Sequence, residues 1–328
     1  MNIVDVDSVM RNDSESARLP HEKRFQSGAA FINGTYCSVG EATIPLYDSG
    51  FVNCDAVYEK MVVSRGRFFR LQDHYERFAR SCEKFRLRNP HTNEEMTAIF
   101  SELLRLGGFR EAGLFWCVTR GVEIPLKETD THSNSNGCRF YATADRYLSI
   151  STQEQRNRGL ELWISTDHTR IQPKAVDPRA KNFHWMDLKL SIFEAHDHGK
   201  EWSVLTDANG YLTEAPGANV FVLKEGALYT PDAGCLEGIT RKSVIELAKT
   251  LGVSVHLTKV HADDLRRAED AFLTSSAGGV MPVNSVDGIL LGNRVGPGEL
   301  VTKLHNLYWE SLWDGWKGTP IDYSGSAL

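Results

Sequence analysis

The chain has 328 residues, a length typical of two domains or one large domain. With 41% hydrophobic and 24% charged residues, the composition excludes a mostly disordered chain. The net charge of −6 excludes the broad basic surface on which nucleic-acid affinity depends. Runs of about 18 apolar residues and a secretory-signal pattern are both missing, so we expect a cytoplasmic protein without membrane contacts. Neither CxxC nor HExxH spacing occurs, so we expect no metal site.

The first half of the sequence predicts an N-terminal arm over residues 1–27 and a small α+β domain over residues 28–146. Alternating and helical patterns place the elements of this domain in a definite order. They are a hairpin over 29–39 turning at Asn33-Gly34, two strands within 56–71 joined at 64–66, helices over 71–87 and 93–108, and strands over 113–121 and 139–147.

The second half predicts a linker over residues 147–156 and a larger domain over residues 157–328. Its expected elements are a strand over 161–167, a loop with prolines over 172–182, a helix over 185–199, two strands around Asn209-Gly210, a hairpin over 220–231, a helix over 238–252, and a helix, strand and turn within 263–288. We find neither a GxGxxG after a strand nor a Walker-type loop, so the fingerprints of dinucleotide and nucleotide phosphates are missing.

Four features of the second half offer chemistry that fits together. Lys181 lies between apolar and aromatic residues, where partial desolvation favours the neutral amine that forms imines. Glu214 precedes a turn of small residues, where a carboxylate could hold a pyridine nitrogen protonated. Residues 238–240 open a helix and residues 274–279 form a turn of hydroxyls and glycines, so both favour phosphate. Each feature alone is also explained by an ordinary loop, turn or cap, but together they suit pyridoxal phosphate.

Six segments, spread over about residues 28–310, resemble the class IV (fold type IV) pyridoxal-phosphate aminotransferases. The segment VDPRAKNFHWMDL is most similar to the R-selective amine transaminases, and branched-chain and D-amino-acid aminotransferases are the neighbouring branches of the family. In chain order the segments are FINGTYCSVGEATIPLYDSGF, FFRLQDHYERF, VDPRAKNFHWMDL, LTEAPGANVF, LEGITRKSVIELA and TSSAGGVMPVNSVDG.

The resemblance implies a two-domain α+β fold with a small N-terminal α/β domain, a larger C-terminal pseudo-barrel domain and a homodimeric assembly. Lys181 matches the catalytic lysine, which binds the cofactor covalently and moves the proton, and Glu214 matches the acid at the pyridine nitrogen. Arg77 matches the phosphate-binding arginine, with Arg80 as second choice. The remaining cofactor positions implied in this way are Trp185, Ile239, Thr240, Ser275 and Ser276.

The expected substrate pocket lies around the segment VYEKMVV. Strand alternation places Tyr58 and Lys60 on one face and Glu59 on the other, and in the resembled family the face with the tyrosine lines the pocket. We therefore hypothesise that Lys60 pairs with a substrate carboxylate. The alternatives are that Lys60 extends to solvent or pairs with neighbours of Glu59.

This pocket departs from the resembled amine transaminases at several positions. Asn53 stands where they often carry a histidine, and Lys60 where they usually carry an apolar residue. Gly113 and Phe115 replace the bulky and acidic residues expected there. The loop after Gly121 lacks the arginine that grips the keto acid, although Lys127 is nearby.

The expected activity is a ping-pong transamination from an R-amine or a D-amino acid to an α-keto acid. A branched-chain L-amino acid is the alternative donor. A lyase of the aminodeoxychorismate type would use the same lysine without a second half-reaction. A non-catalytic cofactor-binding protein would not need Lys181, Glu214 and both phosphate sites together.

Overall fold

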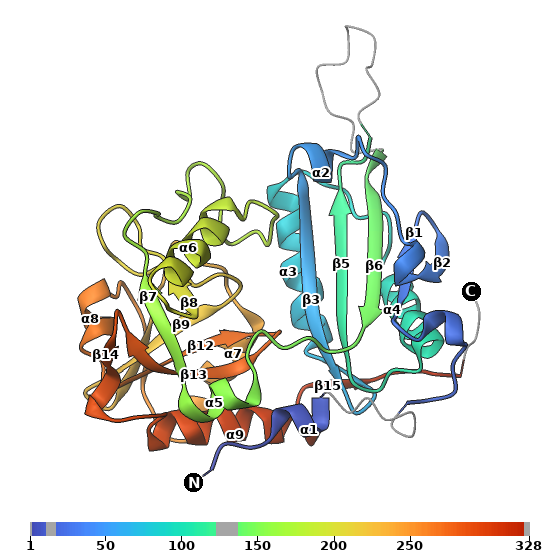
Figure 1. Cartoon of the computed structure of the whole chain (residues 1–328). Helices are drawn as coiled ribbons and strands as arrows, with labels where there is room; N and C mark the ends of the chain where they lie inside the picture. The colour runs from blue at the N-terminus through green and yellow to red at the C-terminus, as the bar shows by residue number, and fades with distance from the viewer. Residues whose placement is uncertain (1, 11–17, 123–136, 325–328) are drawn as a thin grey trace, which may run out of the picture. The chain divides into compact units, whose positions relative to one another are not determined.

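The computed structural model describes residues 2–10, 18–122 and 137–324, and the chain forms two compact units (Figure 1). We call them the seven-stranded unit, built from residues 8–148, 180–183 and 315–328, and the eight-stranded unit, built from residues 1–7, 149–179 and 184–314. None of the helices within the described residues is both long and apolar enough to cross a membrane.

The seven-stranded unit is an antiparallel sheet in the order β15-β4-β3-β5-β6-β1-β2, with two long helices on one face. The strands are β1 (Ala29–Ile32), β2 (Thr35–Ser38), β3 (Ala56–Ser64), β4 (Arg67–Phe69), β5 (Ala112–Thr119), β6 (Arg139–Asp145) and β15 (Gly318–Pro320). The helices are α2 (Ser49–Val52), α3 (Leu71–Lys84) and α4 (Asn93–Gly107), and the short α1 (Val6–Met10) begins in the residues of the eight-stranded unit. Helix α3 lies along β3, and α4 lies along β6 and β1 (Figure 1).

Local sequence signals explain the boundaries of these elements. The β1–β2 hairpin turns at Asn33 and Gly34, which both have positive φ, as the predicted tight turn requires. A capping box between Thr92 and Glu95 begins α4, and Gly108 in the left-handed conformation ends it. The hairpin, both helices and the strands predicted over residues 28–146 are therefore confirmed.

The core of this unit explains which face of the sheet carries the helices. Val57, Met61 and Val63 of β3 point to the same side as Trp116 of β5, and Phe100 of α4 packs against Trp116 with ring centroids 4.8 Å apart. Because side chains alternate along a strand, Tyr58 and Lys60 of β3 and Phe115 of β5 lie on the other face.

The eight-stranded unit is a mixed sheet in the order β11-β10-β9-β12-β13-β7-β8 with β14 paired to β13. Its strands are β7 (Leu160–Ile164), β8 (Trp202–Val204), β9 (Asn219–Lys224), β10 (Ala227–Thr230), β11 (Val255–Leu257), β12 (Asp270–Ser275), β13 (Gly279–Val286) and β14 (Ile289–Leu290). Its helices are α5 (Gln153–Arg158), α6 (Met186–Asp197), α7 (Ile239–Thr250), α8 (Ala262–Arg266) and α9 (Glu299–Trp313). The expected α+β class with two sheets is confirmed.

The structure corrects two expectations about the second half. Residues 318–320, expected in the domain 157–328, form β15 and hydrogen-bond to β4 in the other sheet. Of the two strands expected around Asn209-Gly210, the first is β8, which ends at Val204, and the second is reduced to isolated bridges at Tyr211 and Leu212. There the Asp207 carboxylate accepts hydrogen bonds from the N–H groups of Asn209 and Tyr211, which favours a turn over a longer ladder.

Two further differences concern the N-terminal arm and the C-terminal helix. Part of the arm expected over residues 1–27 packs on the eight-stranded unit, because the N–H of Val4 donates to Asn306 Oδ1 of α9. Helix α9 itself is absent from our sequence prediction. Its buried Val301, Leu304, Tyr308 and Leu312 recur every three or four residues, so the helical period was readable in that segment.

Candidate active site

Lys181 is held by main-chain contacts within the seven-stranded unit. Its N–H donates to Ser81 Oγ of α3 at 3.1 Å, and its carbonyl accepts from the N–H of Tyr58 of β3 at 2.9 Å. The next residue, Asn182, forms an antiparallel bridge with Val57. The Lys181 amine lies 4.5 Å from the centroid of the Tyr58 ring. The proposed catalytic amine is therefore placed on the Tyr58 face by a strand and a helix.

Arg77, the proposed phosphate arginine, lies on the opposite face of β3 beside a buried carboxylate. Its Nε and Nη2 donate to the two oxygens of Glu59 at 2.7 and 2.6 Å, and His74 Nδ1 lies 2.7 Å from Glu59 Oε2. Burial alone raises the pKa of Glu59, but the charge and hydrogen bonds of Arg77, followed by those of His74, lower it to about 2. Glu59 is thus ionised and fixes the Arg77 guanidinium. Arg80, the second choice, is exposed.

Tyr58 and Lys60 of β3 share one sheet face with Phe115 of β5, as the alternation read from the sequence predicts. The Tyr58 ring packs against the rings of Phe115 and Phe183, with centroid distances of 5.7 and 4.7 Å. Lys60 lies directly across from Phe115 in the register of the two strands. Glu59 is on the other face with Arg77, so the alternation read from the sequence holds.

Lys60 has an acidic neighbour, Asp145, that the sequence analysis missed. Burial lowers the pKa of Lys60, Asp145 raises it, and Lys181 lowers it. Burial raises the pKa of Asp145, against the effect of Lys60. A Cβ atom on Gly113 would lie 3.4 Å from Asp145 Oδ1 and 3.9 Å from Lys60 Cε. Gly113 therefore leaves room for both side chains, and the antiparallel pairing of Gly113 with Asp145 brings them together.

Two other pocket expectations have different outcomes. Asn53 is the exposed C-terminal cap of α2, and its N–H donates to the carbonyl of Ser49. Lys127 and most of the loop after Gly121 lie outside the described residues.

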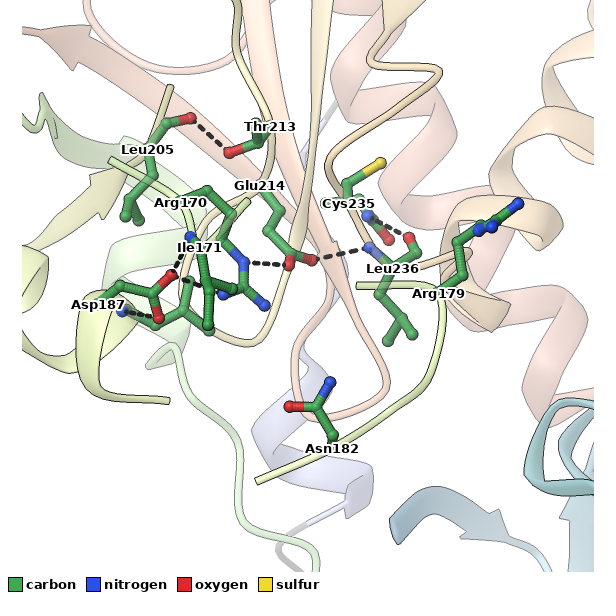
Figure 2. Close-up of polar contacts among 12 residues, drawn as sticks. Arg170, Ile171, Arg179, Asn182, Asp187, Leu205, Thr213, Glu214, Cys235 and Leu236 are labelled. Carbon is green, nitrogen blue, oxygen red and sulfur yellow. Dashed lines mark hydrogen bonds and ion pairs between the residues drawn. The ribbon is translucent and has the colours of Figure 1, made fainter. Parts of the chain in front are cut away.

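Glu214 is held at both of its oxygens within the eight-stranded unit (Figure 2). Arg170 Nε donates to Oε1 at 2.8 Å, and the N–H of Leu236 donates to Oε2 at 3.0 Å. Arg170 Nη1 also donates to Asp187 Oδ2, at 2.6 Å. Burial lowers the pKa of Arg170, but Glu214 and Asp187 outweigh it and raise the value above normal. Each carboxylate oxygen can accept more than one hydrogen bond, so Glu214 retains acceptor capacity.

The start of α7 is an uncapped helix N-terminus. Gly238 is the N-cap residue and supplies no side chain, so the first N–H groups of the helix lack the usual internal acceptor. Thr240 is buried in the first turn, and the alternative that it is an ordinary N-cap is wrong. Gly238 packs so closely against the Asn219 side chain that a Cβ would clash with Asn219 Oδ1. Asn219 Nδ2 also donates to the carbonyl of Leu236, at 2.7 Å.

The β12–β13 turn lies at the same edge of this sheet. Thr274 pairs directly with Asn219 across β12 and β9, and Thr274 Oγ1 is buried without a hydrogen-bond partner in the described structure. Ser275 Oγ accepts from the N–H of Ala277 at 3.2 Å, and Ser276 follows in the turn. An uncapped helix start beside an unpartnered hydroxyl suits a phosphate group. The residues present therefore fit the cofactor that the sequence implied.

Trp185 lies beside the turn that follows Glu214. It is the N-cap residue of α6, and its ring would lie 3.2 Å from a Cβ on Gly217. The eight-stranded unit thus holds Trp185, Glu214, the start of α7 and the β12–β13 turn. The seven-stranded unit holds Lys181, Arg77 and the substrate face.

Sequence reasoning missed the residues that hold these groups in place. They are Glu59, Ser81, Asp145, Arg170 and Asp187. Alternation along β3 already placed Glu59 on the face opposite Tyr58. It did not indicate that Arg77 is the partner of Glu59. For Arg170 and Asp187, the short segment between a strand and a helix offered no periodic signal.

Comparisons with known proteins identify the family of the chain. The model of the family described as amino-transferase class IV matches residues 56–286. A putative branched-chain-amino-acid aminotransferase of Methanocaldococcus jannaschii is 28% identical, over 84% of this chain and 93% of its own. A D-alanine aminotransferase of Bacillus licheniformis is 25% identical, over 86% of this chain and 96% of its own. A branched-chain amino acid aminotransferase from T.th., solved with pyridoxamine 5'-phosphate, superposes with a TM-score of 0.81 at 25% identity, covering 91% of this chain and all of that one.

Proposed function

The chain belongs to the class IV aminotransferases, which use pyridoxal phosphate, and on this premise we propose that it moves an amino group from an R-amine or a D-amino acid to an α-keto acid. The observation that carries the proposal is the placement of Lys181. Its amine lies over Tyr58, on the sheet face that also presents Lys60 and Phe115.

The bound cofactor supplies an aldehyde that takes up the amino group and a ring that withdraws electrons from the adjacent carbon. Lys181 would bind that aldehyde and carry the proton that the reaction moves. Glu214 would keep the ring nitrogen protonated, with its carboxylate held in place by Arg170. Within the eight-stranded unit, the α7 start, Ser275 and Ser276 would contribute to holding the phosphate, and Trp185 would contact the cofactor. Arg77 is the residue that the seven-stranded unit would contribute to the phosphate.

For the substrate, Lys60 supplies a positive charge on the Tyr58 face. Against the effect of burial, Asp145 raises the pKa of Lys60, which favours the charged amine. A substrate carboxylate then forms a charged hydrogen bond with Lys60, whereas a simple amine does not. This favours amino and keto acids as one partner of the reaction. The D-alanine aminotransferase relatives and the resemblance around Lys181 support an R-amine or D-amino-acid donor.

The proposal includes a homodimer. Large apolar side chains are exposed along one short stretch of the seven-stranded unit: Ile44, Leu46, Tyr47, Phe51 and Val52. Tyr47 is 73% exposed and Leu46 is 67% exposed. Contiguous exposed apolar surface is typical of a protein interface, and we expect a second copy of the chain to cover it. Light scattering after chromatography should give twice the chain mass, and Leu46→Glu should shift it toward the monomer.

The covalent role of Lys181 is tested by borohydride reduction and mass analysis. The freshly purified yellow protein should carry the reduced cofactor on the peptide that contains Lys181. The same sample treated with hydroxylamine before reduction is the control and should carry none. An unmodified Lys181 in the yellow protein contradicts the proposal.

The donor is tested with separate enantiomers of 1-phenylethylamine, alanine and leucine. Loss of the yellow absorption of the bound aldehyde form should be fastest with the R-amine or D-alanine. A response to L-leucine alone identifies the branched-chain alternative, supported by the archaeal relative. Release of pyruvate from one substrate without any keto acid identifies the lyase alternative.

A further inference from the structure

Ser81 connects the proposed catalytic lysine to the helix that carries the proposed phosphate arginine. It is completely buried on α3. Its Oγ donates to the carbonyl of Arg77, four residues earlier, at 2.9 Å. The same oxygen accepts the N–H of Lys181 at 3.1 Å, across 100 residues of sequence.

The hydrogen bond within the helix fixes the direction of the second one. A serine hydroxyl that donates to the carbonyl four residues earlier has a defined rotamer and keeps its lone pairs available. In Ser81, Oγ uses such a lone pair to accept the hydrogen bond from the Lys181 N–H. The residue therefore provides a rigid acceptor on a helix, for a chain segment that belongs to neither α3 nor the sheet.

Strand β3 also holds the chain segment that contains Lys181. The Tyr58 N–H donates to the Lys181 carbonyl, and Asn182 bridges to Val57. The Lys181 N–H thus donates to an acceptor on α3, and the Lys181 carbonyl accepts from a donor on β3. The side chain starts from this fixed point and places its amine 4.5 Å from the Tyr58 ring centroid.

We propose that Ser81 is a positioning residue for Lys181, which sets where the amine lies and so how readily it moves the substrate proton. This rests on the proposed function, because it assumes that Lys181 does that chemistry. Ser81 does not contact the reacting atoms, and its effect passes through the main chain of Lys181. Near-attack geometry is sensitive to displacements of this kind, so loss of the contact should slow proton movement more than substrate binding.

Three substitutions at position 81 separate positioning from packing. Ser81→Ala removes the acceptor, and Ser81→Cys replaces it with a weak one of similar volume, which keeps the test valid if the alanine variant does not fold. Ser81→Thr retains the hydroxyl. Ser191→Ala is the matched control, because Ser191 is also a fully buried helix serine that donates to a carbonyl, that of Leu188.

Hydrogen exchange of the full-length holoenzyme, followed by mass spectrometry, measures the contact without relying on activity. Exchange at the Lys181 amide should become about 10-fold faster in Ser81→Ala and Ser81→Cys, the change expected for loss of one hydrogen bond. Ser81→Thr should restore the slow rate, and Ser191→Ala should leave Lys181 unchanged. Unchanged exchange at Lys181 in both the alanine and cysteine variants overturns the proposal.

Kinetics then test whether the contact matters for the reaction. In Ser81→Ala and Ser81→Cys, kcat should fall about 10-fold with KM unchanged, the consequence of losing an interaction that acts in the transition state. The isotope effect for a donor deuterated at the reacting carbon should rise. Faster amide exchange with unchanged kcat and isotope effect overturns the positioning role. Borohydride labelling of the wild-type protein is scored separately, so failure of the proposed function is recognised by an unlabelled Lys181.

Discussion

In each unit, one of the charged residues proposed to contact the cofactor is fixed by an opposite charge. In the seven-stranded unit Arg77 is held by Glu59, a fully buried strand residue inside an aromatic core. In the eight-stranded unit Glu214 is held by Arg170, from the loop between β7 and α6, and by a main-chain N–H.

The difference lies in what supports the counter-ion. Glu59 is surrounded by core side chains and is shared with His74, so its pair with Arg77 depends on the packing of α3 against β3. Arg170 also binds Asp187 in the first turn of α6. Its pair with Glu214 therefore depends on how the loop that carries Arg170 contacts that helix. The first arrangement links the site to the stability of the unit, and the second links it to local loop geometry. Substitutions should therefore separate the two regions by what they damage.

The largest expected effect is on stability, from Glu59→Gln. Removing one partner of a buried ion pair leaves Arg77 uncompensated, so we expect the free energy of unfolding to fall by about 3–5 kcal/mol. Urea denaturation measures it. Glu41→Gln is the control, because Glu41 pairs with Arg24 on the surface, and its loss should be far smaller. Equal losses for the two variants would show that the buried pair has no special role.

The same pair predicts an acid dependence. The pKa of Glu59 falls from 4.5 to about 2 on folding, so its contribution is complete above about pH 4.5 and is lost as the pH falls toward 2. Glu59→Gln should remove this part of the acid transition. If the stability of Glu59→Gln still falls with the wild-type slope between pH 4.5 and 2, Glu59 is not the group responsible.

Glu214→Gln should act on the reaction instead. An amide has no negative charge to keep the ring nitrogen protonated, so we expect kcat to fall by about 10²–10³-fold, the usual loss for one preorganised electrostatic group. Steady-state kinetics and denaturation are measured on the same samples. The exposed Glu310 serves as control, and Glu310→Gln should leave kcat unchanged. Comparable stability losses for Glu59→Gln and Glu214→Gln would remove the distinction between the two regions.

Lys60→Ala tests the substrate face. Loss of a charged hydrogen bond costs about 1.5–3 kcal/mol of binding free energy, so KM for keto and amino acids should rise roughly 10- to 150-fold. KM for simple amines should change little. Lys303→Ala removes a lysine paired only on the surface of α9 and should change neither. Equal losses for amino acids and simple amines would exclude a carboxylate contact.

The smallest expected effect comes from a half-buried acid, Glu111, with one oxygen left unpaired among the described residues. Glu111 Oε1 accepts the N–H of Arg65, but Oε2 is buried without a partner among the described residues. Burial raises the pKa of Glu111 to about 7, against hydrogen bonds and nearby arginines that lower it. A raised carboxyl pKa means that its stabilising contribution is present below about pH 4.5 and is lost as the pH rises through 7.

Glu111→Gln should therefore increase stability at pH 8 by about 1 kcal/mol and flatten the decline between pH 4.5 and 7. Thermal unfolding at several pH values measures it. A decrease at pH 8 would mean that the ionised carboxylate is stabilised in the fold after all.

Much of the site was readable from sequence because its signals are local. The glycine that opens α7, the turn of hydroxyls after β12 and the alternation at Tyr58 and Lys60 each depend on neighbours within a few residues. The same holds for the capping box of α4 and the hairpin at Asn33-Gly34.

The sequence by itself predicted the chemistry proposed for the site: an amine, an acid, two turns that suit phosphate and a sheet face with a lysine. Only the tertiary structure decided what holds these groups. Glu59 meets Arg77 across 18 residues, Arg170 meets Glu214 across 44, and Ser81 meets Lys181 across 100. Such pairings depend on strand register and on how helices pack against a sheet, and short-range patterns do not encode either. The same reason explains why β15, at the end of the chain, lies in the sheet formed by its beginning.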